Sequence, residues 1–183
     1  MANDVMTHIA GFYQATHAQV LALVGGLEDG QLVWRPNPTT PSIAFHVWHL
    51  TRWADYLQEM IGDGGSQLWE SEGLAAAWGL EPANLGFAQT GLGLGADASD
   101  ALVLPKKETL LGYAREAFAL ADQAVAAIDD EQFHRRVRDL HQVEGEETEV
   151  GEAVLNWLKH DNRHLGMIEC MLGVQGRRGT ATR

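Results

Sequence analysis

The sequence predicts an all-α fold, a four-helix bundle with a long crossover segment between its second and third helices. Apolar residues recur at helical spacing in four segments, and no stretch of any length alternates as a β-strand does. The four segments are about 4–25, 43–61, 106–128 and 150–172. Four amphipathic helices in a chain of 183 residues are typical of a helical bundle.

Residues that commonly begin or end helices bound the first two segments. Gly25 and Gly26 stop the first helix, whose expected buried side consists of Val5, Ile9, Phe12, Val20 and Val24. Residues 29–41 are rich in proline, glycine and asparagine, which indicates a loop. This loop ends in Ser42, which can cap the second helix, and Gly62 closes that helix.

The last two helices complete the bundle. We expect the third helix to bury one side, made of Leu110, Leu111, Ala114, Phe118, Ala121, Val125 and Ile128. The fourth helix ends at Gly173. A chain of this length with 45% hydrophobic residues can bury one core and is short for two. The sequence therefore predicts a single domain over residues 1–175, followed by a C-terminal tail at 176–183.

Residues 62–105, between the second and third helices, form a segment too long for an ordinary bundle loop. Its first part, residues 66–80, can form a short helix, and its second part is rich in glycine. Residues 91–96 match a dinucleotide-binding spacing, but no flanking strand and helix support that interpretation, and we reject it. The segment is interpreted as a mobile lid over a site or as a crossover connection.

Charge and composition exclude several classes of partner. The net charge of −12 and the lack of a basic stripe make nucleic acid an unexpected partner. No stretch reaches the roughly 18 consecutive apolar residues of a membrane span, so no membrane partner is expected. A single cysteine, Cys170, excludes an internal disulfide and a cysteine-based zinc site. The N-terminus lacks the features of a signal peptide, and we expect a cytoplasmic protein.

Histidines lie on the apolar faces of two helices. Successive helical residues turn by about 100°, which places His160 and His164 together at one edge of the apolar face of the fourth helix. In the second helix His46 and His49 both fall within the apolar face. Four buried imidazoles that converge cannot easily supply hydrogen-bond partners for all of one another's ring nitrogens. A metal ion resolves this, because it accepts a lone pair from each of its ligands. The alternative is a plain bundle with partly exposed histidines and no metal.

An i,i+4 pair of histidines can chelate one ion, and a third histidine from a facing helix completes a tripod with open positions. Asp161 falls inside the apolar face, so it needs a partner such as a histidine N–H or an arginine. The other histidines, which are His8, His17, His134 and His141, have no chelating partner, and we expect none of them to bind the metal. Cys170 points away from the histidines and is not an expected ligand.

Four parts of the chain resemble the DinB superfamily of four-helix-bundle metalloenzymes. They are residues 41–57 and 157–182 and the connecting segments 27–38 and 68–80. The resemblance covers most of the chain and is weakest across the third helix.

That resemblance implies a ligand set. Members of the family bind a divalent metal through one histidine of the second helix and two histidines of an H-x-x-x-H motif in the fourth. Here these residues are His49, His160 and His164. His46 would then lie behind the ligands or face the substrate. Zinc and nickel are the metals we expect most, although imidazole also suits copper and iron.

The resemblance also implies an activity, because the family includes thiol-dependent S-transferases and a mycothiol-dependent maleylpyruvate isomerase. We expect a metal-dependent enzyme that uses a low-molecular-weight thiol and a small-molecule substrate. The alternatives are a metal-dependent hydrolase and a non-catalytic metal-binding stress-response protein. His46 and Asp161 are the candidate catalytic bases. Arg52 and Arg163 could hold carboxylates of the thiol, but their expected place at helix edges favours surface residues.

We also predict a homodimer. Six tryptophans are more than a core of this size usually needs, and the helical projection places Trp48 off the buried side of its helix. Because tryptophan is enriched at protein interfaces, Trp48 is expected to contact a second copy.

Overall fold

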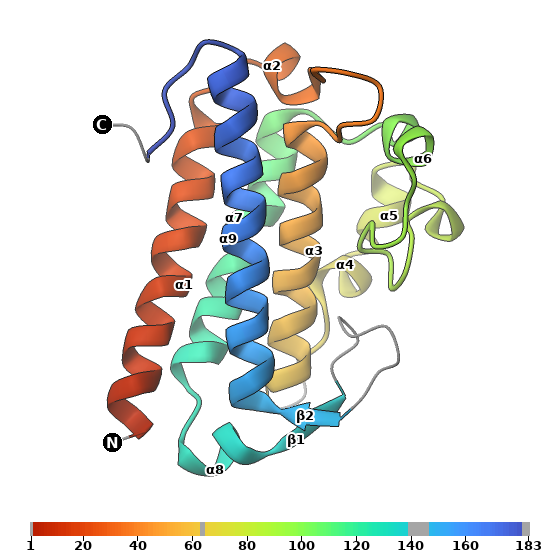
Figure 1. The fold of residues 1–183 in the computed structure, drawn as a ribbon. Helices are drawn as coiled ribbons and strands as arrows, with labels where there is room; N and C mark the ends of the chain where they lie inside the picture. Colours follow the sequence, from red (N-terminus) through yellow and green to blue (C-terminus); the bar gives the residue numbers. More distant parts are fainter. Residues whose placement is uncertain (1, 63–64, 139–146, 181–183) are drawn as a thin grey trace.

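The computed structural model describes residues 2–62, 65–138 and 147–180 and confirms the all-α fold. The bundle consists of α1 (Ala2–Gly25), α3 (Ile43–Ile61), α7 (Lys107–Ala126) and α9 (Val150–Val174). In Figure 1, α1 and α9 run in one direction, and α3 and α7 run in the other. Since α3 and α7 are parallel, the chain must return along the whole bundle between them. This return is the reason for the long crossover segment at residues 62–105.

Short elements connect the four bundle helices. Four of them, α4, α5, η1 and α6, belong to the crossover segment, and Figure 1 shows α4, α5 and α6 on the outer side of α3. The connecting elements are α2 (Asp29–Val33), α4 (Leu68–Ser71), α5 (Leu74–Ala77), the 3-10 helix η1 (Pro82–Asn84), α6 (Ala96–Ala101), α8 (Asp130–His134), β1 (Arg136–Arg138) and β2 (Glu147–Glu149). The two strands pair antiparallel, with Val137 opposite Thr148.

The structure corrects three local expectations. Residues 29–33, expected in a loop, form α2, whose first turn is held by a hydrogen bond from the Glu28 backbone N–H to the Gln31 side chain at 2.9 Å. The helix expected over residues 66–80 is broken into α4 and α5 at Gly73, which has a φ of 60°. The strands β1 and β2 were not expected either. Elements of three to five residues are too short to show a periodic pattern.

The helix ends follow the expected signals. The Ser42 side chain accepts a hydrogen bond from the Phe45 backbone N–H at 3.2 Å, and Gly62 lies at the C-cap of α3. All seven residues expected on the buried side of the third helix are buried. In α1, Val5 and Phe12 were expected inside but are 54% and 63% exposed. They lie at the edge of the buried side, which is centred closer to Tyr13.

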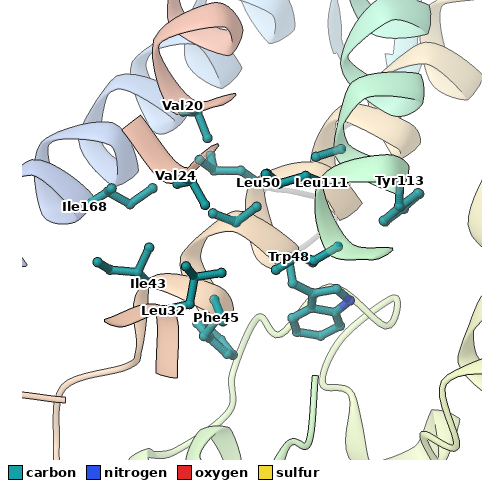
Figure 2. Packing of buried hydrophobic residues seen from close by; sticks show 14 of the residues in the cluster. Val20, Val24, Leu32, Ile43, Phe45, Trp48, Leu50, Leu111, Tyr113 and Ile168 are labelled. Carbon is teal, nitrogen blue, oxygen red and sulfur yellow. The ribbon is translucent and has the colours of Figure 1, made fainter. Parts of the chain in front are cut away.

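The prediction for Trp48 is wrong, because this side chain is 0% exposed within its own chain. Residues 43–55 of α3 are all buried, including the side that the helical projection assigned to solvent. Figure 2 shows Trp48 packed beneath the crossover segment, and its ring centroid lies 6.1 Å from that of Trp69. The crossover segment covers this side of α3, which explains why a helix with apolar residues on most sides is stable here.

Within the described residues, no helix combines the length and the apolar character that a membrane crossing requires.

Candidate metal centre

Three imidazoles from two facing helices converge inside the bundle. They belong to His49 on α3 and to His160 and His164 on α9. Each ring offers one nitrogen, and these nitrogens all lie within 4.8 Å of one another. His49 and His160 are each 6% exposed, and His164 is partly exposed. The three histidines are those that the sequence predicts as ligands, and their arrangement could hold a metal ion.

Hydrogen bonding determines which nitrogen of His49 is available. Its Nδ1 lies 2.5 Å from the backbone carbonyl oxygen of Thr90. A carbonyl can only accept, so Nδ1 carries the proton and Nε2 keeps the lone pair. This Nε2 lies 3.1 Å from the Nε2 of His160. Two nitrogens bound to one tetrahedral zinc ion lie about 3.3 Å apart, so the observed spacing fits a shared ion.

His160 is supported by the next residue. Its Nδ1 lies 3.3 Å from Oδ1 of Asp161, whose side chain is buried. Burial raises the pKa of Asp161, but the hydrogen bond from His160 and the nearby His17 outweigh this effect and lower the pKa. The carboxylate is therefore ionised and can accept the Nδ1 proton of His160. The prediction that a histidine N–H partners Asp161 is confirmed, and a carboxylate behind a histidine is the usual support for a metal ligand.

His17 of α1 extends this support across the bundle, a role that was not predicted from the sequence. Its Nδ1 lies 2.7 Å from Oδ1 of Asp122 on α7, and its Nε2 lies 3.6 Å from Oδ2 of Asp161. The ring also stacks on Phe118 at a centroid distance of 4.0 Å. Burial lowers the pKa of His17, but Asp122 and Asp161 outweigh it and raise the pKa to about 9. The protonated imidazole thus lies between the buried carboxylate of Asp161 and the partly buried carboxylate of Asp122.

His46 contacts the third histidine of the cluster. Its Nδ1 lies 3.0 Å from Nδ1 of His164. Burial lowers the pKa of His46 to about 4, while burial and the neighbouring histidines lower that of His164 to about 2. Both rings are neutral at neutral pH, so a single proton lies between the two nitrogens. If His164 donates it, the Nε2 of His164 keeps a lone pair for a metal.

Comparison with known proteins identifies the family of this chain. Residues 13–168 match the sequence model of the DinB superfamily. The chain belongs to the DinB superfamily. Among solved structures, it is similar to the crystal structure of a conserved protein from Enterococcus faecalis, with 16% identity and a TM-score of 0.69. The alignment covers 92% of this DinB chain and 98% of the other and shows a shared fold. A comparison with curated proteins gives no match.

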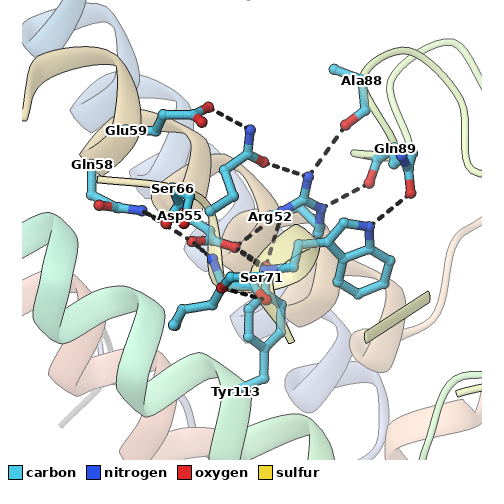
Figure 3. Close-up of polar contacts among 12 residues, drawn as sticks. Arg52, Asp55, Gln58, Glu59, Ser66, Ser71, Ala88, Gln89 and Tyr113 are labelled. Atoms are coloured by element: carbon cyan, nitrogen blue, oxygen red, sulfur yellow. Dashed lines mark hydrogen bonds and ion pairs between the residues drawn. The ribbon is translucent and has the colours of Figure 1, made fainter. Parts of the chain in front are cut away.

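The two arginines considered for the site of this DinB protein differ in position. Arg163 is exposed, as expected. Arg52 was expected at the surface but is 1% exposed, because the crossover segment covers its side of α3. Its guanidinium donates to Asp55 at 3.2 Å and to the backbone carbonyl of Gln89 at 3.0 Å (Figure 3). Arg52 therefore binds the crossover segment instead of facing an open ligand site.

Among the described residues, the group of possible ligands includes no other histidine. His8 is exposed, and His134 lies 3.0 Å from Glu149 at the surface. His17 is held by Asp122, as described above. His141 lies outside the described residues. That none of these four binds the metal stays a prediction.

Proposed function

We propose that this DinB protein is a metal-dependent enzyme that uses a low-molecular-weight thiol in an S-transferase or isomerase reaction on a small-molecule substrate. A divalent ion, zinc or nickel, would be held by His49, His160 and His164. The observation that carries the proposal is the buried cluster of three imidazoles from α3 and α9, whose nitrogens lie within 4.8 Å of one another. DinB membership supports the same ligand set.

The number of ligands favours catalysis over a structural role. Structural zinc sites are usually closed by four protein ligands, whereas catalytic sites use three and leave a position for solvent or substrate. Among the described residues, the group of possible ligands contains three histidines. His46 is the nearest candidate for a fourth, but its Nδ1 is directed to His164 at 3.0 Å. His46 is therefore better placed to orient His164 than to close the site.

The residues around the cluster have distinct roles in this proposal. A bound divalent ion would supply the positive charge that favours the thiolate form of a thiol cofactor. The carbonyl of Thr90 holds the Nδ1 proton of His49, and Asp161 accepts that of His160. His46 fixes the orientation of His164. Asp161 is 5% exposed and sits between His160 and His17, so we assign it to positioning and not to contact with substrate.

If Asp161 has a positioning role, the alternative of a metal-dependent hydrolase loses one of its two candidate bases. Hydrolysis usually requires a general base beside the attacking water. Because Asp161 is occupied by two histidines, His46 is left as the candidate base, and its pKa of about 4 makes it a weak one. The weakness of this base is our reason for ranking the hydrolase below the thiol-dependent enzyme. A non-catalytic metal-binding protein is the outcome if no thiol binds.

Cobalt substitution tests the thiol proposal. Thiolate ligation to cobalt produces a charge-transfer absorption band, whereas oxygen ligands do not. We expect this band when glutathione, mycothiol, bacillithiol or cysteine is added to the cobalt-loaded protein. Serine, which has a hydroxyl in place of the thiol, is the matched control for cysteine and should produce no band. If none of the four thiols produces the band, the S-transferase proposal is wrong.

We also propose a homodimer, although Trp48 does not support it because this residue is buried within its own chain. The exposed apolar side chains of Phe12 on α1 and Leu155 on α9, which are 63% and 49% exposed, support it instead. We expect light scattering to give the mass of two chains across a wide concentration range. A monomer mass throughout that range would contradict the proposal.

A further inference from the structure

Residues 86–92 of the crossover segment, here called the Thr90 turn, contact the histidine cluster directly. The carbonyl of Thr90 accepts the Nδ1 proton of His49 at 2.5 Å, although the two residues lie 41 positions apart. Thr90 is itself 0% exposed. Its hydroxyl donates to the carbonyl of Phe87 at 2.7 Å and accepts from the backbone N–H of Leu92 at 3.3 Å. The position of the Thr90 carbonyl thus depends on the conformation of the whole turn.

Two residues of the Thr90 turn adopt an unusual backbone conformation. Ala88 and Gln89 have φ values of 48° and 54°, in the left-handed region that residues other than glycine rarely occupy. Such conformations persist only where surrounding contacts hold them, and they are common at functional sites. The Thr90 turn therefore needs an anchor outside itself.

Arg52 supplies that anchor from α3. Its guanidinium donates to the carbonyls of Gln89 at 3.0 Å and Ala88 at 3.4 Å, the two residues with positive φ (Figure 3). Nη1 of Arg52 donates to Asp55 at 3.2 Å, and the Nη2 that donates to Ala88 also donates to Gln67 at 2.7 Å. The Gln89 side chain is also fixed, because the indole N–H of Trp69 donates to it at 2.8 Å.

Close packing fixes the other end of the turn. Gly91 has a φ of 87°, and a Cβ at this position would lie 2.9 Å from ring atoms of both Phe45 and Trp48. Phe45 in turn stacks on His49 with a centroid distance of 5.8 Å and an interplanar angle of 12°. The turn and the His49 ring are therefore packed on the same aromatic side chain.

We propose that Arg52 is a positioning residue of the metal centre: it holds the Thr90 turn so that the Thr90 carbonyl keeps His49 in the tautomer whose Nε2 can bind a metal. The crossover segment is then a fixed wall of the centre. This inference rests on the proposed metal binding by His49. Supports behind metal-binding histidines commonly change metal affinity by about 10- to 100-fold when they are removed.

Two variants disturb the Thr90 turn from opposite ends. Arg52→Lys keeps a positive charge beside Asp55, but an ammonium group has three donors and cannot replace the five hydrogen bonds of the guanidinium. Gly91→Ala leaves Arg52 and Asp55 intact and forces the turn away from Phe45 and Trp48. The control is Arg35→Lys, because Arg35 also holds a loop, donating to the carbonyl of Thr40 at 2.6 Å, and its ion pair with Asp100 lies outside the Thr90 turn.

The first measurement is the tautomer of His49, read from the ¹⁵N chemical shifts of its ring nitrogens in metal-free protein. We expect the Nδ1–H tautomer in the unmodified protein and in Arg35→Lys, and a mixture of tautomers in Arg52→Lys and Gly91→Ala. The ¹⁵N chemical shift reports the hydrogen bond between His49 and Thr90. A general loss of stability does not change this shift as long as the protein remains folded. An Nε2–H tautomer in the unmodified protein would overturn the inference even if neither variant folds.

The second measurement is the affinity for Co²⁺ in competition with a chelator. We expect Arg52→Lys and Gly91→Ala each to bind about tenfold more weakly or worse, and Arg35→Lys to bind like the unmodified protein. Unchanged affinity in both folded variants, with tight binding by the unmodified protein, contradicts only the role of Arg52. If the unmodified protein itself binds no Co²⁺, the proposed metal centre fails, and this inference fails with it.

Discussion

Replacement of both proposed α9 ligands, His160→Ala with His164→Ala, is expected to abolish binding of the proposed divalent ion. The two imidazoles come from one helix, with ring centroids 4.5 Å apart, and their loss leaves His49 as the last member of the cluster. One imidazole cannot retain an ion that normally needs three or four ligands. Metal analysis of the purified variant, together with titration by Zn²⁺ or Ni²⁺, measures this effect.

A matched control separates the cluster from other histidines of the chain. His8→Ala with His134→Ala also removes two imidazoles, but both are exposed and far from the cluster in sequence. We expect one ion per chain both in this control and in the unmodified protein. Full metal occupancy in His160→Ala with His164→Ala would place the site elsewhere.

The second large effect is expected from His17→Ala, which removes the cation between Asp122 and Asp161. Both carboxylates would lose a close partner, at 2.7 Å and 3.6 Å, and Asp161 is 5% exposed. Removing one member of a buried ion pair usually costs about 3–5 kcal/mol. We expect a loss of this order in the free energy of unfolding, measured in urea at pH 6 with a chelator present so that bound metal does not contribute.

The stability difference between the unmodified protein and His17→Ala should depend on pH. Folding raises the pKa of His17 from 6.5 to about 9, so the folded state holds the proton more tightly than the unfolded state does. The contribution of His17 is therefore fully present below pH 6.5 and is lost as the pH rises through about 9. Between these values the difference should shrink by on the order of 3 kcal/mol.

Urea titrations at intervals from pH 6 to pH 9.5 measure this pH dependence. The exposed pair of His134 and Glu149 supplies the control, since His134→Ala should change the free energy of unfolding little at any of these pH values. A difference for His17→Ala that stays constant or grows with pH would show that His17 is not held as a cation between the carboxylates.

The histidine cluster could be predicted from the sequence because helical spacing is a local property. His160 and His164 share one edge of α9 whatever surrounds that helix, and His49 lies on the apolar side of α3 for the same reason. The same projection placed Asp161 inside the bundle, where the structure has it. The family resemblance then selected these three histidines from the eight in the chain.

The supports behind the cluster could not be predicted in the same way. His17 and Asp122 are 105 residues apart, and each is unremarkable in its own helix. Their contact depends on how α1 and α7 pack, which the periodicity of either helix does not contain. The sequence contained one indication of these supports, which was the predicted buried position of Asp161. A buried carboxylate requires a cation or hydrogen-bond donor nearby, but the sequence did not identify that partner.

By itself the sequence determined the four long helices and the histidines that α3 and α9 direct into the core. It also determined most of the side of each helix that is buried. All of these follow from residue spacing along one helix. Only the tertiary structure decided what covers the outer side of α3. The crossover segment lies against that side, buries Trp48 and Arg52, and brings the carbonyl of Thr90 to His49. The physical reason is that a helical projection assigns a side without apolar periodicity to solvent, whereas a distant segment of the same chain can replace that solvent with aromatic packing and hydrogen bonds.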